Sequence, residues 1–220
     1  MKHFLMRLFI LMTGLVFFAL GIVITIRANI GYAPWDVFHV GLAHTTGMSI
    51  GLASIIVGIV LAIIVMLLGE KLGLGTILNI VLVGVLIDII FPHVPTAANP
   101  IVGTVMMVIG LFVISIGTYF YIKSAFGAGP RDSLMVVLAR KTKFSVGLCR
   151  SALELFATIA GWFLGGMFGF GTVLVVITIG FCIQITFKAF KFDVTAVRHE
   201  TLSETYAEIK RILAGSNAPS

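Results

Sequence analysis

The sequence predicts an all-α polytopic membrane protein with six transmembrane helices, arranged as 3+3 inverted repeats with a short half-helix after the first span of each repeat. Composition is the first indication: of 220 residues, 59% are hydrophobic and only 11% are charged, whereas soluble domains have about 25% charged residues. Length is the second: the runs 8–26 and 101–122 carry no charged side chain and match the roughly 20 residues that cross hydrocarbon as a helix. These runs lack the two-residue alternation of a membrane barrel.

An internal repeat is the third indication. When the sequence is shifted by 96 residues against itself, residues 14–89 give 24 identities in 76 positions. Apolar residues are often identical by chance when two membrane segments are compared, so the glycine, proline and aspartate pairs are the strongest evidence for the repeat. These pairs include Gly14 with Gly110, Gly21 with Gly117, Gly31 with Gly127, Pro34 with Pro130, and Asp36 with Asp132. We therefore interpret residues 1–92 as the first membrane repeat, 100–188 as the second, and 189–220 as a tail.

Each repeat is expected to contain the same elements in the same order. A first span (8–26 and 101–122) precedes a short apolar stretch (35–43 and 131–139). Two further spans follow in each repeat, at 49–68 and 74–91 and at 145–164 and 171–187. The short stretch has about ten residues, or roughly 15 Å of helix, which is half of a bilayer. We predict that it forms a half-helix that does not cross.

The distribution of positive charge predicts the orientation. Three crossings per repeat turn the second repeat upside down, and this topology places all lysines and arginines except Arg27 on the side of the N-terminus. Cytoplasmic loops are the ones enriched in these residues. We therefore expect a multi-pass protein of the bacterial cytoplasmic (inner) membrane with both termini in the cytoplasm. The N-terminal apolar run exceeds the 7–15 residues of a signal peptide, which favours a retained first span.

A G-x-x-P-x-D motif follows the first span of each repeat. Proline suits the first position of a helix, and the glycines before it allow a sharp turn of the backbone. Each aspartate then stands in the first helical turn, where a carboxylate interacts favourably with free N–H groups. Paired discontinuous helices in inverted repeats are typical of transporter binding sites. The candidate residues for binding a solute or a proton are Gly31, Pro34, Asp36, Gly127, Gly129, Pro130 and Asp132.

Two interpretations of the aspartates remain open. Asp36 and Asp132 could cap their helices at the membrane interface without contacting any solute, or they could bind a cationic group or carry protons in a buried site. Asp88 is a further candidate, because an acidic residue within a span usually faces a cavity or a partner. It is, however, only three residues before Phe91 and could equally reach the interface.

Other classes of protein fit the sequence poorly. His39 and His44 have no counterparts in the second repeat and no further ligand at useful spacing, so no metal site is expected. Cys149 and Cys182 lie in apolar segments, which indicates no disulfide or cofactor framework. The sequence does not mark a nucleophile beside a base, so we do not expect an enzyme. Basic residues gather at helix ends and not on one soluble face, which argues against binding of nucleic acid.

The tail is predicted to form a short amphipathic helix in the cytoplasm. Thr201-x-x-Glu204 is a capping box that opens a helix. An apolar stripe follows at helical spacing, formed by Leu202, Tyr206, Ile209 and Leu213. Within the fifth span, Arg150 and Glu154 are four residues apart and are expected to pair.

The segments "ANIGYAPWDV", "SIGLAS", "GLGT" and "FGAGPRDSL" resemble the YczE/YitT-type family of small bacterial integral membrane proteins. The resemblance extends over residues 1–195 and is greater to the YczE branch, because the chain lacks a large C-terminal domain. It implies a membrane location and a similar architecture. It implies no catalytic residue, because the family offers no agreed activity.

Two functional hypotheses follow. The first is a secondary transporter or exporter of an unknown small solute, working by alternating access of the two repeats around Asp36 and Asp132. The second is a non-transporting scaffold or regulator that acts through its basic loops and tail. The expected partners are the lipid bilayer and the solute, and a homodimer is compatible with so small a bundle.

Overall fold

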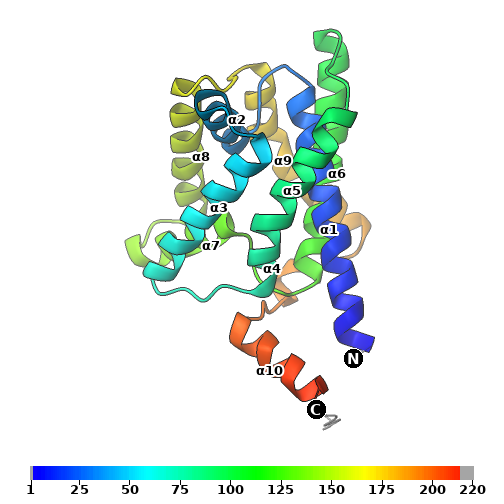
Figure 1. The fold of residues 1–220 in the computed structure, drawn as a ribbon, viewed down its shortest axis with the longest axis vertical. Coiled ribbons are helices and arrows are strands. Elements are labelled where there is room, and N and C mark those ends of the chain that lie inside the picture. Colours follow the sequence, from blue (N-terminus) through cyan, green and yellow to red (C-terminus); the bar gives the residue numbers. More distant parts are fainter. Residues whose placement is uncertain (1, 214–220) are drawn as a thin grey trace.

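The computed structural model describes residues 2–213, which are helical throughout their regular structure and contain no strand. Six helices in this range are long and apolar enough to cross a membrane, which confirms the predicted number of spans. They are α1 (Lys2–Arg27), α3 (Ile50–Leu67), the composite span Leu74–His93, α6 (Pro100–Lys123), α8 (Val146–Phe163) and α9 (Phe170–Ala189). Figure 1 shows them as one bundle with both described chain ends at the same side.

The two short helices are α2 (Pro34–Thr46) and α7 (Pro130–Thr142), each of 13 residues. Both begin at the predicted proline. Both run three residues further than predicted, because the helix is ended only by a residue in the left-handed region, Gly47 at φ 74° and Lys143 at φ 62°. At 1.5 Å per residue their length is about 20 Å, which is still too short to cross a bilayer. Figure 1 places α2 at the end of the bundle opposite the termini and α7 nearer to them.

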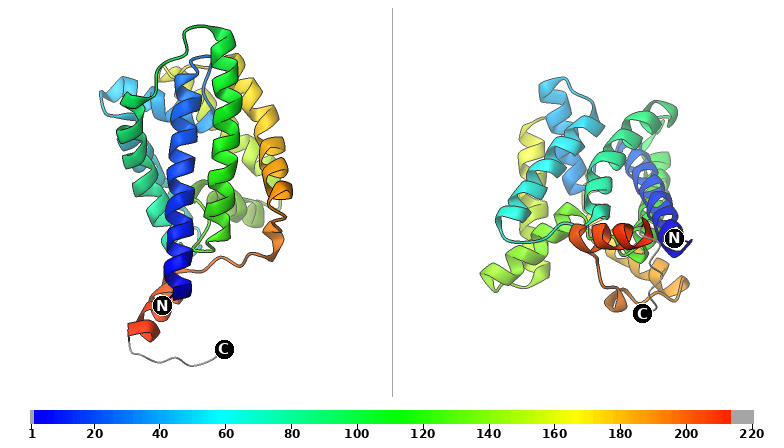
Figure 2. Two further views of the ribbon diagram at one scale, coloured as in Figure 1. Left: turned by 90° about the vertical axis from the view of Figure 1, so that its right-hand side faces the viewer. Right: turned by 60° about the horizontal axis from the view of Figure 1, so that its bottom comes forward.

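Helices α1 and α6 run side by side at one side of the bundle (Figure 2). Glycines permit their close approach: a Cβ added to Gly14 would lie 2.6 Å from the backbone nitrogen of Tyr121, and one added to Gly21 would lie 2.7 Å from that of Ile114. Gly14 faces Gly117 and Gly21 faces Gly110, so the two helices are antiparallel. Gly14 and Gly110 are 96 residues apart in the sequence, as are Gly21 and Gly117, so each helix meets the other through the same two positions.

The loops before the half-helices are fastened to the opposite repeat by equivalent hydrogen bonds. Gly75 N–H donates to the carbonyl of Phe126, and Gly171 N–H donates to the carbonyl of Ile30, both at 2.7 Å. Residues 30 and 126 are 96 positions apart, as are residues 75 and 171, so one contact occurs twice. The loops bend at Gly31 and Gly127, whose φ angles of 115° and 121° favour glycine.

The third span is irregular in a way that the sequence analysis did not predict. It begins as α4 (Leu74–Leu78), continues as the π-helix η1 (Asn79–Val83), resumes as α5 (Gly84–Ile90) and ends in the 3₁₀ turn η2 (Phe91–His93). Its counterpart in the second repeat, α9, is a continuous α-helix. Short π-helical segments frequently lie at functional sites.

The tail contains a 3₁₀ turn, η3 (Val194–Ala196), and the predicted helix, α10 (Leu202–Leu213). The capping box is confirmed: Thr201 N–H donates to Glu204 Oε2 at 2.7 Å, and Glu204 N–H donates to Thr201 Oγ1 at 3.4 Å. The backbone and hydroxyl bonds from Thr201 lower the pKa of the Glu204 carboxyl. Leu202 and Tyr206 of the predicted stripe are exposed, whereas Thr205 is buried. The side chain of Leu213 lies outside the described residues.

The two repeats differ in how their second and third spans pack. In the first repeat α3 packs on α5, with Gly51 against the carbonyl of Gly84. Asp88 reinforces this contact by accepting hydrogen bonds from Ser49 Oγ at 2.5 Å and from Gly51 N–H at 2.8 Å. In the second repeat the equivalent glycines, Gly147 and Gly180, are exposed, and a Cβ on either would meet no described heavy atom within 4 Å.

This difference in packing predicts that alanine is tolerated at Gly147 but not at the equivalent Gly51. A methyl group at Gly51 would collide with the Gly84 backbone and the Asp88 carboxylate, so Gly51→Ala should destabilise the protein by about 1–3 kcal/mol, as overpacking does. Gly147→Ala is the matched control and should leave stability unchanged or slightly raised, because alanine favours helix. Unfolding in a titration of dodecyl sulfate measures both. Equal effects of the two substitutions would contradict the asymmetric packing.

Candidate functional site: a central cavity between the half-helices

A cavity of about 250 Å³ lies between the two repeats. Phe18 and Ile22, in the second half of α1, contribute to its wall, and Ile114 and Thr118 contribute from α6. The cavity therefore lies beside the α1–α6 pair. Most of its lining is apolar, and its polar groups come chiefly from α2, α7 and α8.

The first turns of both half-helices line this cavity. Residues 33–36 contribute from α2 and residues 129–132 from α7. The N-cap residues Ala33 and Gly129 make no side-chain cap, so the N–H groups of the first turns lack the usual capping partner. Two helix N-termini with free donors and a favourable dipole thus face a shared space.

The residues predicted as binding candidates fall into three groups: those that line the cavity, those in the loops before the half-helices, and Asp88. The residues that line the cavity are Pro34, Asp36, Gly129, Pro130 and Asp132.

Gly31 and Gly127 lie in the loops before the half-helices and pack on Gly169 and Gly73, respectively. Asp88 does not line the cavity but ties α5 to the start of α3. The structure therefore brings the two motif aspartates to one cavity and leaves Asp88 apart from them.

The Asp36 side of the cavity holds a buried network that joins the half-helices. Asp36 is 3% exposed, and its Oδ1 lies 3.5 Å from Nδ1 of His39, which is 1% exposed. At the other ring nitrogen of His39, Nη2 of Arg131 lies 3.2 Å from Nε2. The Arg131 guanidinium also stacks over the ring of Trp35, 5.0 Å from its centroid.

The Asp132 side is more open and more highly charged. Asp132 and Arg150 are exposed, and Arg150 Nε donates to Glu154 Oε1 at 2.8 Å, which confirms the predicted pair. Tyr121 also lines the cavity, and its hydroxyl is buried without a hydrogen-bond partner in the described part of the chain. A buried hydroxyl normally finds a partner, so this oxygen is available to a bound molecule.

Sequence reasoning missed three of these residues as members of a site. His39 was set aside because it lacks a counterpart in the second repeat, where Met135 stands. Tyr121 gave no signal, because an aromatic residue near the end of a span is common in membrane proteins. Arg131 was counted only as a topology signal. Its position next to the repeated proline was the available clue.

The comparisons with known proteins agree with this architecture. The model of a family of unknown function (DUF6198) matches residues 5–188. The chain is 35% identical to an uncharacterized membrane protein, YczE, of Bacillus subtilis over 176 residues, covering 79% of this chain and 81% of that protein. It is 31% identical to an uncharacterized protein of Haemophilus influenzae over 175 residues, covering 80% of each chain.

A third relative, the uncharacterized protein YyaS of Bacillus subtilis, is 26% identical over 179 residues, covering 78% of this chain and 88% of that protein. No solved structure is significantly similar to the chain. The resemblance to the YczE branch is thus confirmed. The chain is an integral membrane protein and belongs to the DUF6198 family.

Proposed function

We propose that this protein is a secondary transporter of a small solute that works by alternating access of two inverted repeats. The observation that carries the proposal is the shared cavity, because the N-termini of two equivalent half-helices line it together with charged side chains. Secondary transporters bind their substrates at such discontinuous helices, near the bilayer midplane.

The packing of α1 against α6 supports the inverted arrangement of the two repeats. Helices α1 and α6 are equivalent in sequence and antiparallel in space. If both cross the membrane, they cross it in opposite directions, and the pseudo-two-fold axis that relates them lies in the membrane plane. The positions of α2 and α7 toward opposite ends of the bundle fit the same axis (Figure 1). The positive charges at the N-terminal side support a location of both termini in the cytoplasm of a bacterial cell.

The unequal packing of the repeats supports alternation. Gly51 and Gly84 are in contact, while the equivalent Gly147 and Gly180 face open space. Asp36 is buried, while the equivalent Asp132 is exposed. Between two repeats of similar sequence, this difference in packing and exposure corresponds to one closed and one open side of the cavity. Exchange of the two packing modes would close α8 on α9 and part α3 from α5.

The cavity favours a small solute with both apolar and charged or polar parts. Its volume of about 250 Å³ is just below the usual range of ligand pockets, about 300–1,000 Å³. Its walls are largely apolar, and its charged side chains are those of Asp36, Arg131, Asp132, Arg150 and Glu154. Together with the lipid bilayer, this solute is the partner that we propose; a homodimer stays a prediction.

Neutralising either motif aspartate should abolish transport. A library of small solutes is first screened for raising the melting temperature of the purified protein, and the hits are assayed for uptake into proteoliposomes. Asp36→Asn should reduce uptake by at least about tenfold, because a buried charge contact contributes about 2 kcal/mol or more. Asp132→Asn should reduce uptake as well, because its carboxylate lines the same cavity. Asp88→Asn is the control for solute binding: it removes a carboxylate outside the cavity, so the solute should still raise the melting temperature of this variant. Normal uptake by both motif variants would contradict the proposal.

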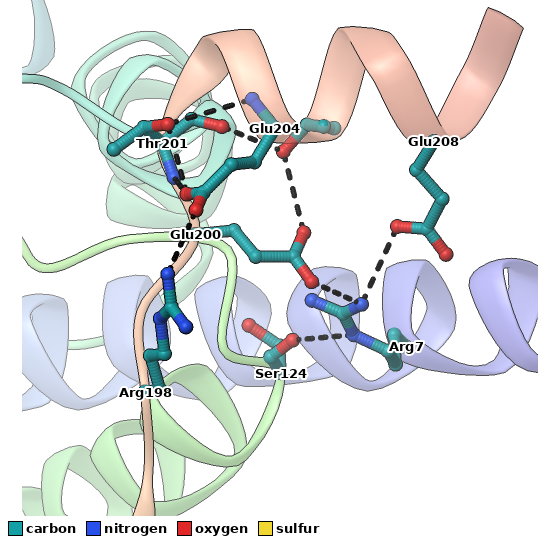
Figure 3. Close-up of polar contacts among 8 residues, drawn as sticks. Arg7, Ser124, Arg198, Glu200, Thr201, Glu204 and Glu208 are labelled. Atoms are coloured by element: carbon teal, nitrogen blue, oxygen red, sulfur yellow. Dashed lines mark hydrogen bonds and ion pairs between the residues drawn. The ribbon is translucent and has the colours of Figure 1, made fainter. Parts of the chain in front are cut away.

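A second function is favoured by the docking of the tail. Arg7 of α1 pairs with Glu200 at 2.7 Å and Glu208 at 3.5 Å, and its Nε donates to the carbonyl of Ser124 at 3.0 Å (Figure 3).

Backbone bonds extend this contact to both repeats, from Glu200 N–H to the carbonyl of Ala125 at 2.8 Å and from Leu202 N–H to that of Leu72 at 2.9 Å. A regulator or scaffold could act by releasing this tail. In that case deletion of residues 195–220 would abolish function, while substitution of the motif aspartates would not.

Loss of Arg7 should release the tail from the bundle. Arg7→Gln removes both ion pairs from a side chain that is only 14% exposed, and we expect faster hydrogen exchange across residues 200–213. Arg198→Gln is the control, because Arg198 is 88% exposed and pairs with Glu204 within the tail. Exchange is followed by mass spectrometry of peptides from detergent-solubilised protein. Unchanged exchange in Arg7→Gln would show that the backbone bonds hold the tail by themselves.

A further inference from the structure

We propose that His39 is the proton-binding switch that couples the two half-helices: the neutral imidazole holds Arg131 of α7 against α2, and protonation releases it. This inference rests on the proposed transport function and deepens it, because it names the proton as the coupling ion and the side chain that carries it. From the sequence alone, only the aspartates are candidates for proton binding.

The hydrogen-bonding capacities of the three side chains define the neutral state. Arginine only donates, so the contact from Arg131 Nη2 at 3.2 Å requires a lone pair on His39 Nε2. The imidazole proton is then on Nδ1, which faces the Asp36 carboxylate at 3.5 Å. Asp36 fixes the orientation of the ring, and the ring presents its acceptor to the opposite repeat. The hydrogen bond from Arg131 of α7 to His39 of α2 therefore exists only while His39 is neutral.

Protonation has a defined consequence. The added proton occupies Nε2, which removes the acceptor of Arg131 and turns the contact into one between two cations. The Asp36 carboxylate remains beside the imidazolium as its counter-ion. Asp132 and Glu154 are the other carboxylates that act on the Arg131 guanidinium, and they are available to it after release. Proton binding thus shifts a guanidinium from the buried side of the cavity toward its open side.

The surroundings of His39 leave few competing groups. On its own helix Asp36 faces it, and from α7 Arg131 faces it. Helix α3, which packs on α2, contains no ionisable residue. Helix α8, which also packs on α2, brings Arg150 and Glu154 to the cavity.

Two other histidines lie nearby in sequence or in space. His44 is exposed at the end of α2. His199 in the tail feels the charge of Asp132, and burial lowers its pKa. Both therefore require control variants.

The departures from repeat symmetry are complementary. Trp35 and His39 stand in the first repeat where Arg131 and Met135 stand in the second. Arg131 contacts both Trp35 and His39. The positions at which the two half-helices differ in sequence therefore contact one another. This pairing explains why His39 needs no counterpart: one switch between the halves serves the whole molecule.

Trp35 reports directly on the switch. The chain has two tryptophans, so in a Trp162→Phe background the intrinsic fluorescence comes from Trp35 alone, and release of Arg131 from its ring changes the emission. We expect a one-proton transition between about pH 5 and pH 8, the range in which histidine changes its charge. His39→Gln should remove it, because glutamine can accept from Arg131 but does not titrate. His44→Gln and His199→Gln should retain it.

A second readout keeps the test decisive. Proton uptake, followed with a pH dye in weakly buffered solution, should fall by one proton per molecule in His39→Gln. In Arg131→Gln, proton uptake should persist while the fluorescence change is lost. If His39→Gln does not fold, His39→Met, which carries the residue of the second repeat, replaces it. A transition that survives the loss of His39, or is absent from the Trp162→Phe protein, would overturn the proposal.

The failures of this inference and of the proposed function are distinguishable. Solute uptake that is sensitive to Asp36→Asn, in a protein without the transition, would leave a transporter and remove the switch. The transition, in a protein that shows neither solute binding nor uptake, would leave the switch and remove the transporter.

Discussion

Backbone N–H and C=O groups inside a membrane need partners from the protein, since hydrocarbon offers none. The loops before α2 and α7 are irregular and face this constraint most directly. Each loop satisfies it by the same bond to the opposite repeat, Gly75 N–H to Phe126 and Gly171 N–H to Ile30. Glycine is required there because the chains meet backbone to backbone: a Cβ on Gly31 would lie 2.8 Å from the nitrogen of Gly169. The rest of the site depends on this exchange.

Once each loop is held by the other repeat, the positions of the half-helices follow. Both first turns are directed to the space beside the α1–α6 pair, and the cavity forms where they meet. The scaffold of the cavity is nearly symmetric, but its chemistry is not. Ser54 and Gly58 of α3 correspond to Arg150 and Glu154 of α8. The positions at which the two halves of the sequence differ carry the charge of the cavity.

The sequence predicted what depends on local and periodic signals. Span number, the prolines that start α2 and α7, the Arg150–Glu154 pair and the tail capping box all followed from spacing. What it did not predict depends on contacts between distant segments. The π-helix beginning at Asn79 carries no local mark, since the equivalent α9 is regular. His39 gains meaning only through Arg131, which is 92 residues away, and Asp88 is explained only by its bonds to the start of α3.

The most direct test of the account is a distance measurement between equivalent pairs of spin labels in lipid nanodiscs. One pair at Leu52 and Val85 reports on α3 and α5, and the equivalent pair at Leu148 and Phe181 reports on α8 and α9; all four side chains are exposed. The account predicts that acidification shifts the two distance distributions in opposite directions, because closing one side opens the other. Distance distributions that do not change on acidification, or that both shift in the same direction, would contradict alternating access.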